Sequence, residues 1–541
     1  MKDQGPALLF DGAFRVPLFA SIAVPCNNAA KGESVGRDRQ AFRRARIFLV
    51  ACVFVGLHAC RTPPETTVPD LAAAQRGWSW PFSKLWVEDE FAQHPQLAEA
   101  SRYELRLEIS ESLTTVAATL RVWFTNRQPE QLSELPFFCY PNLTSGALEV
   151  AAVTVAGSPV QPAVRGAGSL LVVPLPVPLR PRAGTEITIE YSLRVPEGAA
   201  GEANVFSYTQ GVLSLAHAYP MIPAPRAWDH GPPAPYGDFV TNEVSFYIVR
   251  VGVPEDVVVV APGVELARRS QGGRAEVLFA VGPARELYLA ASRDFVVLEE
   301  QRGGTMVRSA ALRGREEGAT LALEAAHAAL ESFSGRLGPY PFTTLTVVSA
   351  PLRALGMEFP GIIALASRLY DSEAGSDGLP QRVLLEGTLA HEIAHQWFYA
   401  GVGTDQLEEP WIDESLAQYA YWLYWRDRYG DGREAFQEFE DAWNAIGRAQ
   451  IPVGMPVAAY SREEYAAIMY GRAPLFLHAL AGRMGEERFD LLLSEFTRRY
   501  EWQLIDGELF RALAEELCRC GLADLWAEWV GPRAEGARPM D

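Results

Sequence analysis

The sequence predicts a multidomain α+β protein in which a mainly antiparallel β domain precedes a mainly helical domain. Between residues 101 and 303, segments such as YELRLEISE and TEITIEYSLRV alternate apolar and polar residues, which is the period of a half-buried strand. Pro and Gly residues separate these segments. After residue 380, apolar residues recur at helical spacing instead. The change of composition near residue 305 predicts a boundary between an N-terminal β domain, 101–303, and a second domain, 304–541.

The second domain is expected to begin with a helix over 318–338 that ends at a Gly-Pro pair, followed by a strand over 343–351. From residue 380 onward the pattern predicts helices at 381–400, 411–429, 433–447, 462–483 and 486–500, and then a tail to about residue 530.

The N-terminal region predicts export. Residues 42–60 (FRRARIFLVACVFVGLHAC) start with basic residues and continue with a 13-residue apolar run. This run is too short to span a bilayer, which needs about 20 residues, and it is typical of a secretory signal. The segment ends in LHAC, which resembles the lipobox of bacterial lipoproteins, in which the cysteine is lipidated and becomes the mature N-terminus. Cleavage elsewhere and an uncleaved anchor stay open as alternatives.

We therefore expect residues 1–60 to be a leader and residues 61–100, rich in Pro, Thr and Ala, to be a tether from a membrane surface. The protein would then be exported to the cell envelope as a membrane-anchored lipoprotein.

The overall charge and the cysteines exclude two classes of function. The formal net charge is −19, which argues against a nucleic-acid partner because such proteins present a basic face. The six cysteines contain no CxxC pair, so neither a cysteine zinc site nor a thioredoxin-like motif is expected. Cys518 and Cys520 are expected to be buried or idle thiols.

The stretch AHEIAHQWF carries the chemistry of a metal site. On a helix, residues four apart lie on one face, so His391 and His395 can direct imidazole nitrogens at one ion. Glu392 lies about 100° further round the helix and can reach over the site without binding the ion. Two neutral nitrogen ligands and a carboxylate that accepts a proton from bound water are what a hydrolytic zinc needs.

A catalytic zinc also needs a third protein ligand. Glu414 lies at the start of the next expected helix, and eighteen residues separate it from His395. This spacing leaves room for the end of one helix, a turn and the start of a second, antiparallel helix. Without an ion, the two histidines would be buried in an apolar helix with polar nitrogens to satisfy.

HEIAHQWF…WIDESLAQY resembles the signature of the aminopeptidase N family of zinc metallopeptidases, the gluzincin group that includes leukotriene hydrolase. Upstream, LGPYPFTTLTVVSAPLRALGMEFPGII (337–363) is similar to the segment with that family's Gly-x-Met-Glu-Asn motif. Downstream, AIMYGRAPLFLHAL (467–480) resembles the segment with its catalytic tyrosine. AYPMIPAPRAW and VSFYIVRVGVPEDVVVVAPG resemble parts of its N-terminal domain.

The resemblance runs from about residue 101 to 535 and implies a thermolysin-like, mainly helical catalytic domain after the β domain. Only 71 residues follow the candidate catalytic tyrosine, Tyr470, so no C-terminal helical repeat domain is expected.

Carried over residue by residue, the resemblance implies that His391, His395 and Glu414 bind one Zn²⁺ per chain and that Glu392 is the general base. It implies that Tyr470 stabilises the oxyanion of the tetrahedral intermediate.

Tyr465 competes with Tyr470 for the oxyanion role. Tyr470 is preferred because Gly471-Arg472-Ala473 follows it, and the family has a basic residue and small residues after its tyrosine.

Glu358 in LGMEFPG matches the family's glutamate that pairs with the α-amine of the substrate, and Gly356 is expected to line the cleft as part of an edge strand. Two residues depart from the motif, since Leu355 replaces its first glycine and Phe359 replaces its asparagine.

The family's second amine-binding residue, a Gln or Glu of the β domain, has no clear match. Ser214 and His217 are the polar candidates in that region.

These observations predict zinc-dependent hydrolysis of peptide bonds, with removal of N-terminal residues from peptide substrates. Three alternatives stay open: an inactive peptidase-fold binding or scaffold lipoprotein, an endopeptidase, and an epoxide hydrolase on the same scaffold. Bound zinc and hydrolysis of amino-acid arylamides would separate them.

We expect Cys60 to carry a lipid in the exported protein. Mass spectrometry of the mature protein should find acylated Cys60 at its N-terminus, and Cys60→Ala should move the protein from the membrane to the soluble fraction. An unmodified mature N-terminus at another residue would contradict this expectation.

Overall fold

The computed structural model describes residues 93–143, 147–198, 204–228, 236–238, 240–371 and 380–531. The expected leader, most of the expected tether and Cys60 lie outside the described residues. None of the described helices combines the length and the apolar character that a membrane span requires.

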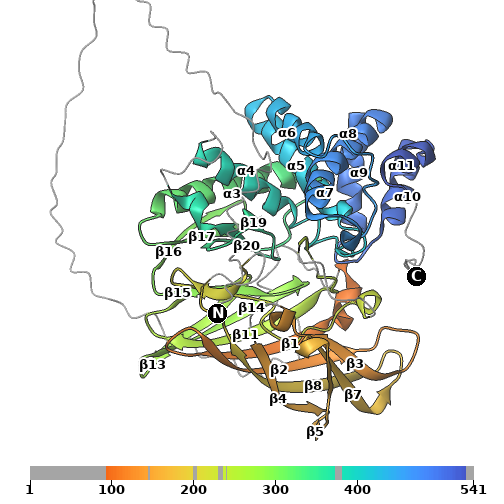
Figure 1. Cartoon of the computed structure of the whole chain (residues 1–541). Helices are drawn as coiled ribbons and strands as arrows, with labels where there is room; N and C mark the ends of the chain where they lie inside the picture. Colours follow the sequence, from red (N-terminus) through yellow and green to blue (C-terminus); the bar gives the residue numbers. More distant parts are fainter. Residues whose placement is uncertain are drawn as a thin grey trace, which may run out of the picture.

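The N-terminal part is built on an eight-stranded sheet, which forms the lower half of Figure 1. Its strand order is β13-β14-β11-β1-β2-β8-β4-β5. Neighbouring strands in it run antiparallel except β1 and β11, which run parallel. The strands are β1 Ser101–Ile109, β2 Thr115–Thr125, β4 Ala147–Val155, β5 Ser158–Pro159, β8 Gly184–Arg194, β11 Ser245–Pro254, β13 Val264–Gln271 and β14 Arg274–Ala284.

Two smaller antiparallel sheets complete this part, in the orders β12-β15-β10-β9 and β3-β7-β6. Their strands are β9 Phe206–Thr209, β10 Val212–Ala216, β12 Val258–Val260, β15 Tyr288–Ser292, β3 Leu132–Phe138, β6 Ala163–Arg165 and β7 Leu170–Leu179.

Strand β11 is buried on both faces and lies between the two hydrophobic cores. Tyr247 and Val249 pack into the core of the β domain, whereas Phe246 and Ile248 pack into the core that contains the helices. Side chains alternate between the faces of a strand, so a strand between two cores reads as a continuous apolar run. The two domains therefore share a wide apolar contact.

The C-terminal part combines a five-stranded sheet, in the order β16-β17-β18-β20-β19, with the helices in the upper half of Figure 1. Helices α3 and α4 lie against this sheet. The strands are β16 Phe295–Arg302, β17 Thr305–Leu312, β18 Thr344–Ala350, β19 Gly356–Met357 and β20 Ile362–Ala366. The helices are α3 Glu316–Leu337, α4 Gln381–Ala394, α5 Trp411–Tyr429, α6 Arg433–Asn444, α7 Arg462–Ala467, the π-helical turn Ile468–Arg472, α8 Ala473–Met484, α9 Glu486–Arg499, α10 Gly507–Cys518 and α11 Ala523–Trp529.

Three expectations from the sequence differ from this arrangement. Strand β16 precedes the domain boundary proposed at residue 303, but it pairs with β17 in the C-terminal sheet, so the change of sheet falls one strand earlier. The helix expected over 381–400 ends at Ala394, where the chain turns. The helix expected over 462–483 is divided by the π-helical turn.

The expectation of idle thiols at Cys518 and Cys520 was wrong, because the two residues form a disulfide. Arg519 ends helix α10 in the left-handed conformation, with φ 55°. This turn brings the two Cα atoms within 5.2 Å, inside the range that a disulfide spans.

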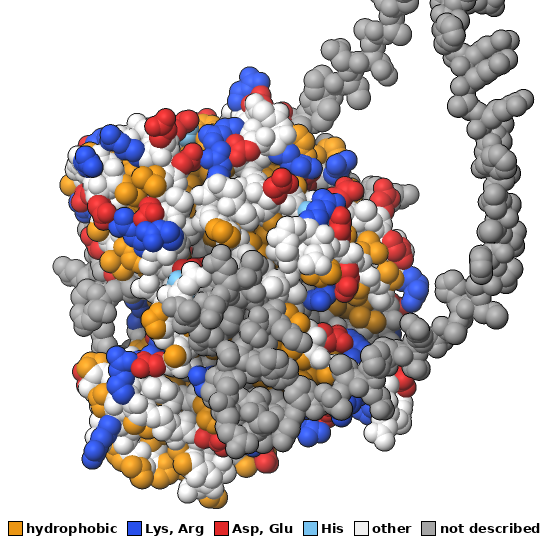
Figure 2. All heavy atoms as spheres, turned by 180° about the vertical axis from the view of Figure 1, so that it is seen from behind, with side chains coloured by type: hydrophobic (Ala, Val, Ile, Leu, Met, Phe, Trp, Pro, Cys, Tyr) orange, Lys and Arg blue, Asp and Glu red, His pale blue; other side chains and the backbone are white. Residues whose placement is uncertain are grey.

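Within the described residues, no further helical domain follows α11. On the face shown in Figure 2, the coloured acidic and basic side chains are interspersed.

Candidate active site

Helices α4 and α5 carry the three predicted metal ligands. His391 lies in the last turn of α4, His395 caps that helix, and Glu414 lies in the first turn of α5. Because both histidines are near the end of α4 and the glutamate is near the start of α5, the two helices meet in antiparallel fashion, as the spacing predicted.

A buried carboxylate ties the far ends of the same two helices together. Glu386, in the first half of α4, accepts hydrogen bonds from the hydroxyls of Tyr424 (2.6 Å) and Tyr429 (2.8 Å) of α5. Arg428 adds an ion pair at 2.7 Å. Charge-assisted bonds of this kind are the stronger ones, and here they fix how α4 lies along α5.

The three ligand groups form a compact triangle. The Nε2 atoms of His391 and His395 are 3.2 Å apart, and Oε2 of Glu414 lies 3.5 Å and 3.9 Å from them. A tetrahedral ion with bonds of about 2.0–2.1 Å has ligand atoms about 3.3–3.4 Å apart, so the triangle has the right size for zinc.

The burial of these groups also fits an ion. Oε2 of Glu414 is buried and accepts no hydrogen bond from the described residues. Burial lowers the pKa of His391 to about 4, against an opposing effect of Gln418. Burial and the neighbouring His391 lower the pKa of His395 as well. Both imidazoles are therefore neutral at pH 7, as metal ligands must be.

A second set of candidate ligand atoms, from Glu358, Glu392 and His395, also lies within 4.8 Å of one another. An ion there would leave His391 and the buried oxygen of Glu414 without a partner. His391, His395 and Glu414 are therefore the better candidate set for a metal position.

Glu392 packs directly against the edge strand β19. A Cβ atom placed on Gly356 would lie 2.3 Å from Oε1 and 2.5 Å from Cδ of Glu392. Only glycine therefore allows the strand and this carboxylate to approach so closely. Burial, and then the charge of Asp238, raise the pKa of Glu392 well above its usual range.

Tyr470 reaches the metal position from the π-helical turn. Its hydroxyl donates a hydrogen bond of 3.1 Å to Oε1 of Glu414. A π-helical turn changes the direction of side chains within a helix and is frequent at functional sites. The turn packs tightly on α6, since a Cβ on Gly471 would lie 2.8 Å from the carbonyl oxygen of Phe439 and from the backbone nitrogen of Trp443.

The competing Tyr465 lies in α7 and is buried, but its hydroxyl has no hydrogen-bond partner among the described residues. Its ring packs against Gly237 and Tyr236. Of the two tyrosines, Tyr470 is therefore the one that bonds to a predicted metal ligand.

Glu358 follows strand β19 and lines a pocket between the two domains. Gln396, the residue after His395, holds the segment that follows Glu358. Its side-chain oxygen accepts a hydrogen bond from the backbone of Gly361 (2.8 Å), and its amide group donates to the carbonyl of Phe359 (3.3 Å).

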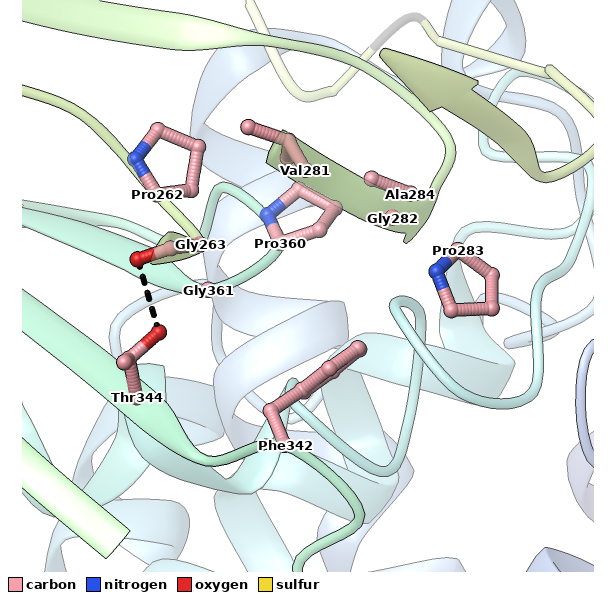
Figure 3. A pocket seen from close by; sticks show the side chains of 10 residues that line it. All are labelled: Pro262, Gly263, Val281, Gly282, Pro283, Ala284, Phe342, Thr344, Pro360 and Gly361. Atoms are coloured by element: carbon pink, nitrogen blue, oxygen red, sulfur yellow. Dashed lines mark hydrogen bonds between the residues drawn. The ribbon is translucent and has the colours of Figure 1, made fainter. Parts of the chain in front are cut away.

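The same segment also packs on the β domain. Figure 3 shows Pro360 and Gly361 facing Pro262 and Val281 across a separate apolar pocket, where the hydroxyl of Thr344 donates to the carbonyl of Gly263 at 2.9 Å. Apolar contacts on one side and Gln396 on the other thus fix the chain that carries Glu358.

The pocket of Glu358 is acidic. Asp238 and Glu286 of the β domain line it with Glu358, His217 and Gln406. Burial raises the pKa of Glu358 well above its usual range, and the charges of Asp238 and Glu392 raise it further. A cation that enters this pocket relieves both effects, so the pocket suits a positively charged group.

Of the two polar candidates for a second amine anchor, His217 lines this pocket and pairs with Glu286. Ser214 instead bonds to the hydroxyl of Tyr288 at 3.2 Å and is not among the residues that line the pocket. The sequence reading missed Asp238 and Glu286, because neither belongs to a recognisable motif and only the fold brings them to Glu358.

Comparison with known proteins places this site in a family. Residues 321–529 match the peptidase family M1 domain. Aminopeptidase M1-B of Oryza sativa subsp. japonica is 25% identical over 237 residues, which cover 42% of this chain and 27% of that protein. Aminopeptidase 2 of Candida albicans is 24% identical over 277 residues, or 48% and 30% of the two chains. The chain thus spans about a quarter to a third of the length of these relatives.

An M1 zinc metallopeptidase from Deinococcus radiodurans has the same fold, with a TM-score of 0.60 at 20% identity over 82% of this chain and 96% of that one. The match includes the β domain as well as the helical domain and agrees with the predicted two-part architecture. Residues 321–529 therefore contain a peptidase family M1 domain, and the matches support an aminopeptidase N-like gluzincin.

Proposed function

We propose that this protein is a zinc-dependent aminopeptidase, which hydrolyses the peptide bond after the N-terminal residue of a peptide. The observation that carries the proposal is the arrangement around one metal position. Two imidazoles and a carboxylate lie at distances that suit a bound zinc ion. A buried glutamate, Glu392, a tyrosine hydroxyl, that of Tyr470, and the acidic pocket of Glu358 lie next to them.

The chemistry divides among the residues as follows. His391, His395 and Glu414 would hold the zinc, which when bound supplies Lewis acidity toward a carbonyl and lowers the pKa of water. Glu392 takes the proton from the attacking water and delivers it to the departing amine. Its raised pKa suits a group that must both accept and release a proton.

Tyr470 stabilises negative charge that develops on the scissile carbonyl oxygen. Its hydroxyl already points to the metal position through its bond to Glu414, and it can donate to an oxyanion instead. Preorganised donors of this kind contribute to the rate because they act on charge that is present only in the transition state.

Glu358 binds the free α-ammonium of the substrate and so selects the end of a chain. Its carboxylate is buried, lies close to Glu392 and faces a pocket with two more carboxylates. A structure of a two-domain M1 zinc metallopeptidase with bound L-arginine supports a site for a free amino acid on this fold. Asp238 and Glu286 are the carboxylates available to assist Glu358. A second proposal, on location, is that the enzyme works at the cell envelope, held there by Cys60.

Glu392→Gln should keep bound zinc and lose about 10²–10⁴-fold in kcat, because the metal ligands remain while the base does not. Zinc content and arylamide hydrolysis measure the two effects. Glu438→Gln, at a buried carboxylate on α6 that bonds to Tyr421, is the matched control and should keep its rate. A Glu392→Gln variant that loses its zinc or keeps its rate would disprove the assignment.

Gly356→Ala should lower kcat by about 10²-fold and leave zinc content unchanged, because the new methyl group must displace the carboxylate of Glu392 by about an ångström. Gly335→Ala is the control, since a Cβ at Gly335 meets no atom within 4 Å. Equal activity of both variants would mean that the position of Glu392 against β19 does not matter for catalysis.

N-acetylation of a peptide should reduce kcat/KM by about 30-fold or more, since a charged pair in a closed cleft contributes about 2–5 kcal/mol. Glu358→Ala should depress cleavage of free-amine peptides to a similar degree and leave acetylated peptides nearly unaffected. If the wild type cuts acetylated peptides equally well, the enzyme is an endopeptidase, and the zinc hydrolase assignment stands without the aminopeptidase one.

A further inference from the structure

The connection between β14 and β15 reaches from the β domain into the back of the metal site. Arg285 in this connection is fully buried and binds only backbone carbonyls. It donates to Tyr399 (2.6 Å), Gly401 (3.1 Å) and Gln503 (2.8 Å) of the catalytic domain and to Asn242 (3.0 Å) of its own. One guanidinium group thus holds the loop that follows α4.

Gly403 leaves space in this loop for the guanidinium group. A Cβ on Gly403 would lie 2.4 Å from Cζ of Arg285, so only glycine leaves room for the guanidinium. The neighbouring Glu286 is buried as well and accepts a hydrogen bond from the hydroxyl of Tyr399. Its other carboxylate oxygen pairs with Nε2 of His217.

Tyr399 therefore has both ends held by the β domain, the carbonyl by Arg285 and the hydroxyl by Glu286. Its backbone has φ 116°, a conformation that is an outlier for a bulky side chain. Such a conformation is strained and persists only where the surroundings hold it in place. Here Arg285 and Glu286 supply that restraint.

The strained residue is directly joined to the support of a metal ligand. Nδ1 of His395 donates to the carbonyl of Phe398 at 3.0 Å, and that carbonyl belongs to the peptide group between Phe398 and Tyr399. The bond leaves Nε2 of His395 free for the ion and fixes the plane of the ring. The position of Tyr399 thus determines where this acceptor lies.

We propose that Tyr399 and Glu286 are positioning residues for the metal ligand His395, so that the β domain aligns the zinc site through this pair. The inference rests on the proposed function for the identity of the metal. It assigns a task to a buried tyrosine that the proposed mechanism does not use. It assigns a second task to Glu286, which also lines the pocket for the ammonium group.

The test compares the full-length wild type with two variants, Tyr399→Phe and Glu286→Gln. Four quantities are measured: the dissociation constant of zinc by competition with a chelator, the visible absorption spectrum after Co²⁺ substitution, kcat and KM. Tyr421→Phe is the matched control, because it removes another buried hydrogen bond from a tyrosine to a glutamate, Glu438. Tyr421 lies seven residues from Glu414, or about 10 Å along α5.

Tyr399→Phe is expected to raise the zinc dissociation constant by about 10–100-fold, the usual effect of losing a partner that supports a ligand. It should also shift the Co²⁺ spectrum and lower kcat with little change in KM. Glu286→Gln should change the zinc affinity and the Co²⁺ spectrum in the same direction but less, since the amide oxygen still accepts from Tyr399. Its KM is not used as a criterion, because Glu286 also lines the pocket for the ammonium group. Tyr421→Phe should leave zinc affinity and the Co²⁺ spectrum as in the wild type.

The proposal is overturned if both variants fold and keep the zinc affinity and Co²⁺ spectrum of the wild type. It is also overturned if Tyr421→Phe weakens zinc binding as much as Tyr399→Phe, which would indicate general loosening of the domain. If Tyr399→Phe does not fold, the nearly isosteric Glu286→Gln decides by the same criteria. A wild type that binds no zinc would instead disprove the proposed function, so the two failures are distinguishable.

Discussion

The antiparallel contact between α4 and α5 is the interaction on which the site depends. Each helix carries part of the ligand set, so a shift of one along the other would open the triangle of His391, His395 and Glu414. Glu386, with its bonds to the far end of α5, restrains such a shift. Tyr470 contacts both helices, because its hydroxyl bonds to Glu414 of α5 and its ring lies beside that of His391 of α4.

Around this contact the protein concentrates buried negative charge. Glu358, Glu392 and Glu414 are all nearly inaccessible. Burial raises the pKa of each, and the charge of Glu392 raises the pKa of the other two further. Burial raises the pKa of the neighbouring Asp413 to about 7, and the charge of Asp238 contributes. Unpaired buried charges are costly, so this region is completed by cations. A metal ion would neutralise the charge at Glu414, and the ammonium group of a peptide would neutralise the charge at Glu358.

The β domain takes part in the site from two directions. Through Asp238 and Glu286 it supplies the acidic wall opposite Glu358. Through Arg285 and Glu286 it holds the loop at the end of α4. This double role gives a physical reason for keeping the β domain attached to the catalytic domain. It agrees with the shared apolar contact along β11.

The parts of this arrangement that depend on local sequence were predictable. The period of the apolar residues predicted the bounds of α5. Spacings of four and eighteen residues singled out His391, His395 and Glu414 as candidate ligands, and the fold brings these three residues together. What the sequence could not show depends on contacts between distant residues. Arg285 and Glu286 lie more than a hundred positions from Tyr399, and neither belongs to a motif. The positive φ of Tyr399 was not predictable either, because the identity of this residue gives no indication of it.

The sheet to which β16 belongs could not be predicted, for a related reason. Alternating residues identify β16 as a strand, but they do not indicate with which sheet it pairs.

Anomalous diffraction at the zinc edge, from crystals of the zinc-loaded protein, tests the central claim most directly. We expect one peak per chain, about 2.0–2.1 Å from Nε2 of His391 and of His395 and about 2.0–2.2 Å from the carboxylate of Glu414. No peak at this position, or a peak between Glu358, Glu392 and His395 instead, would contradict it.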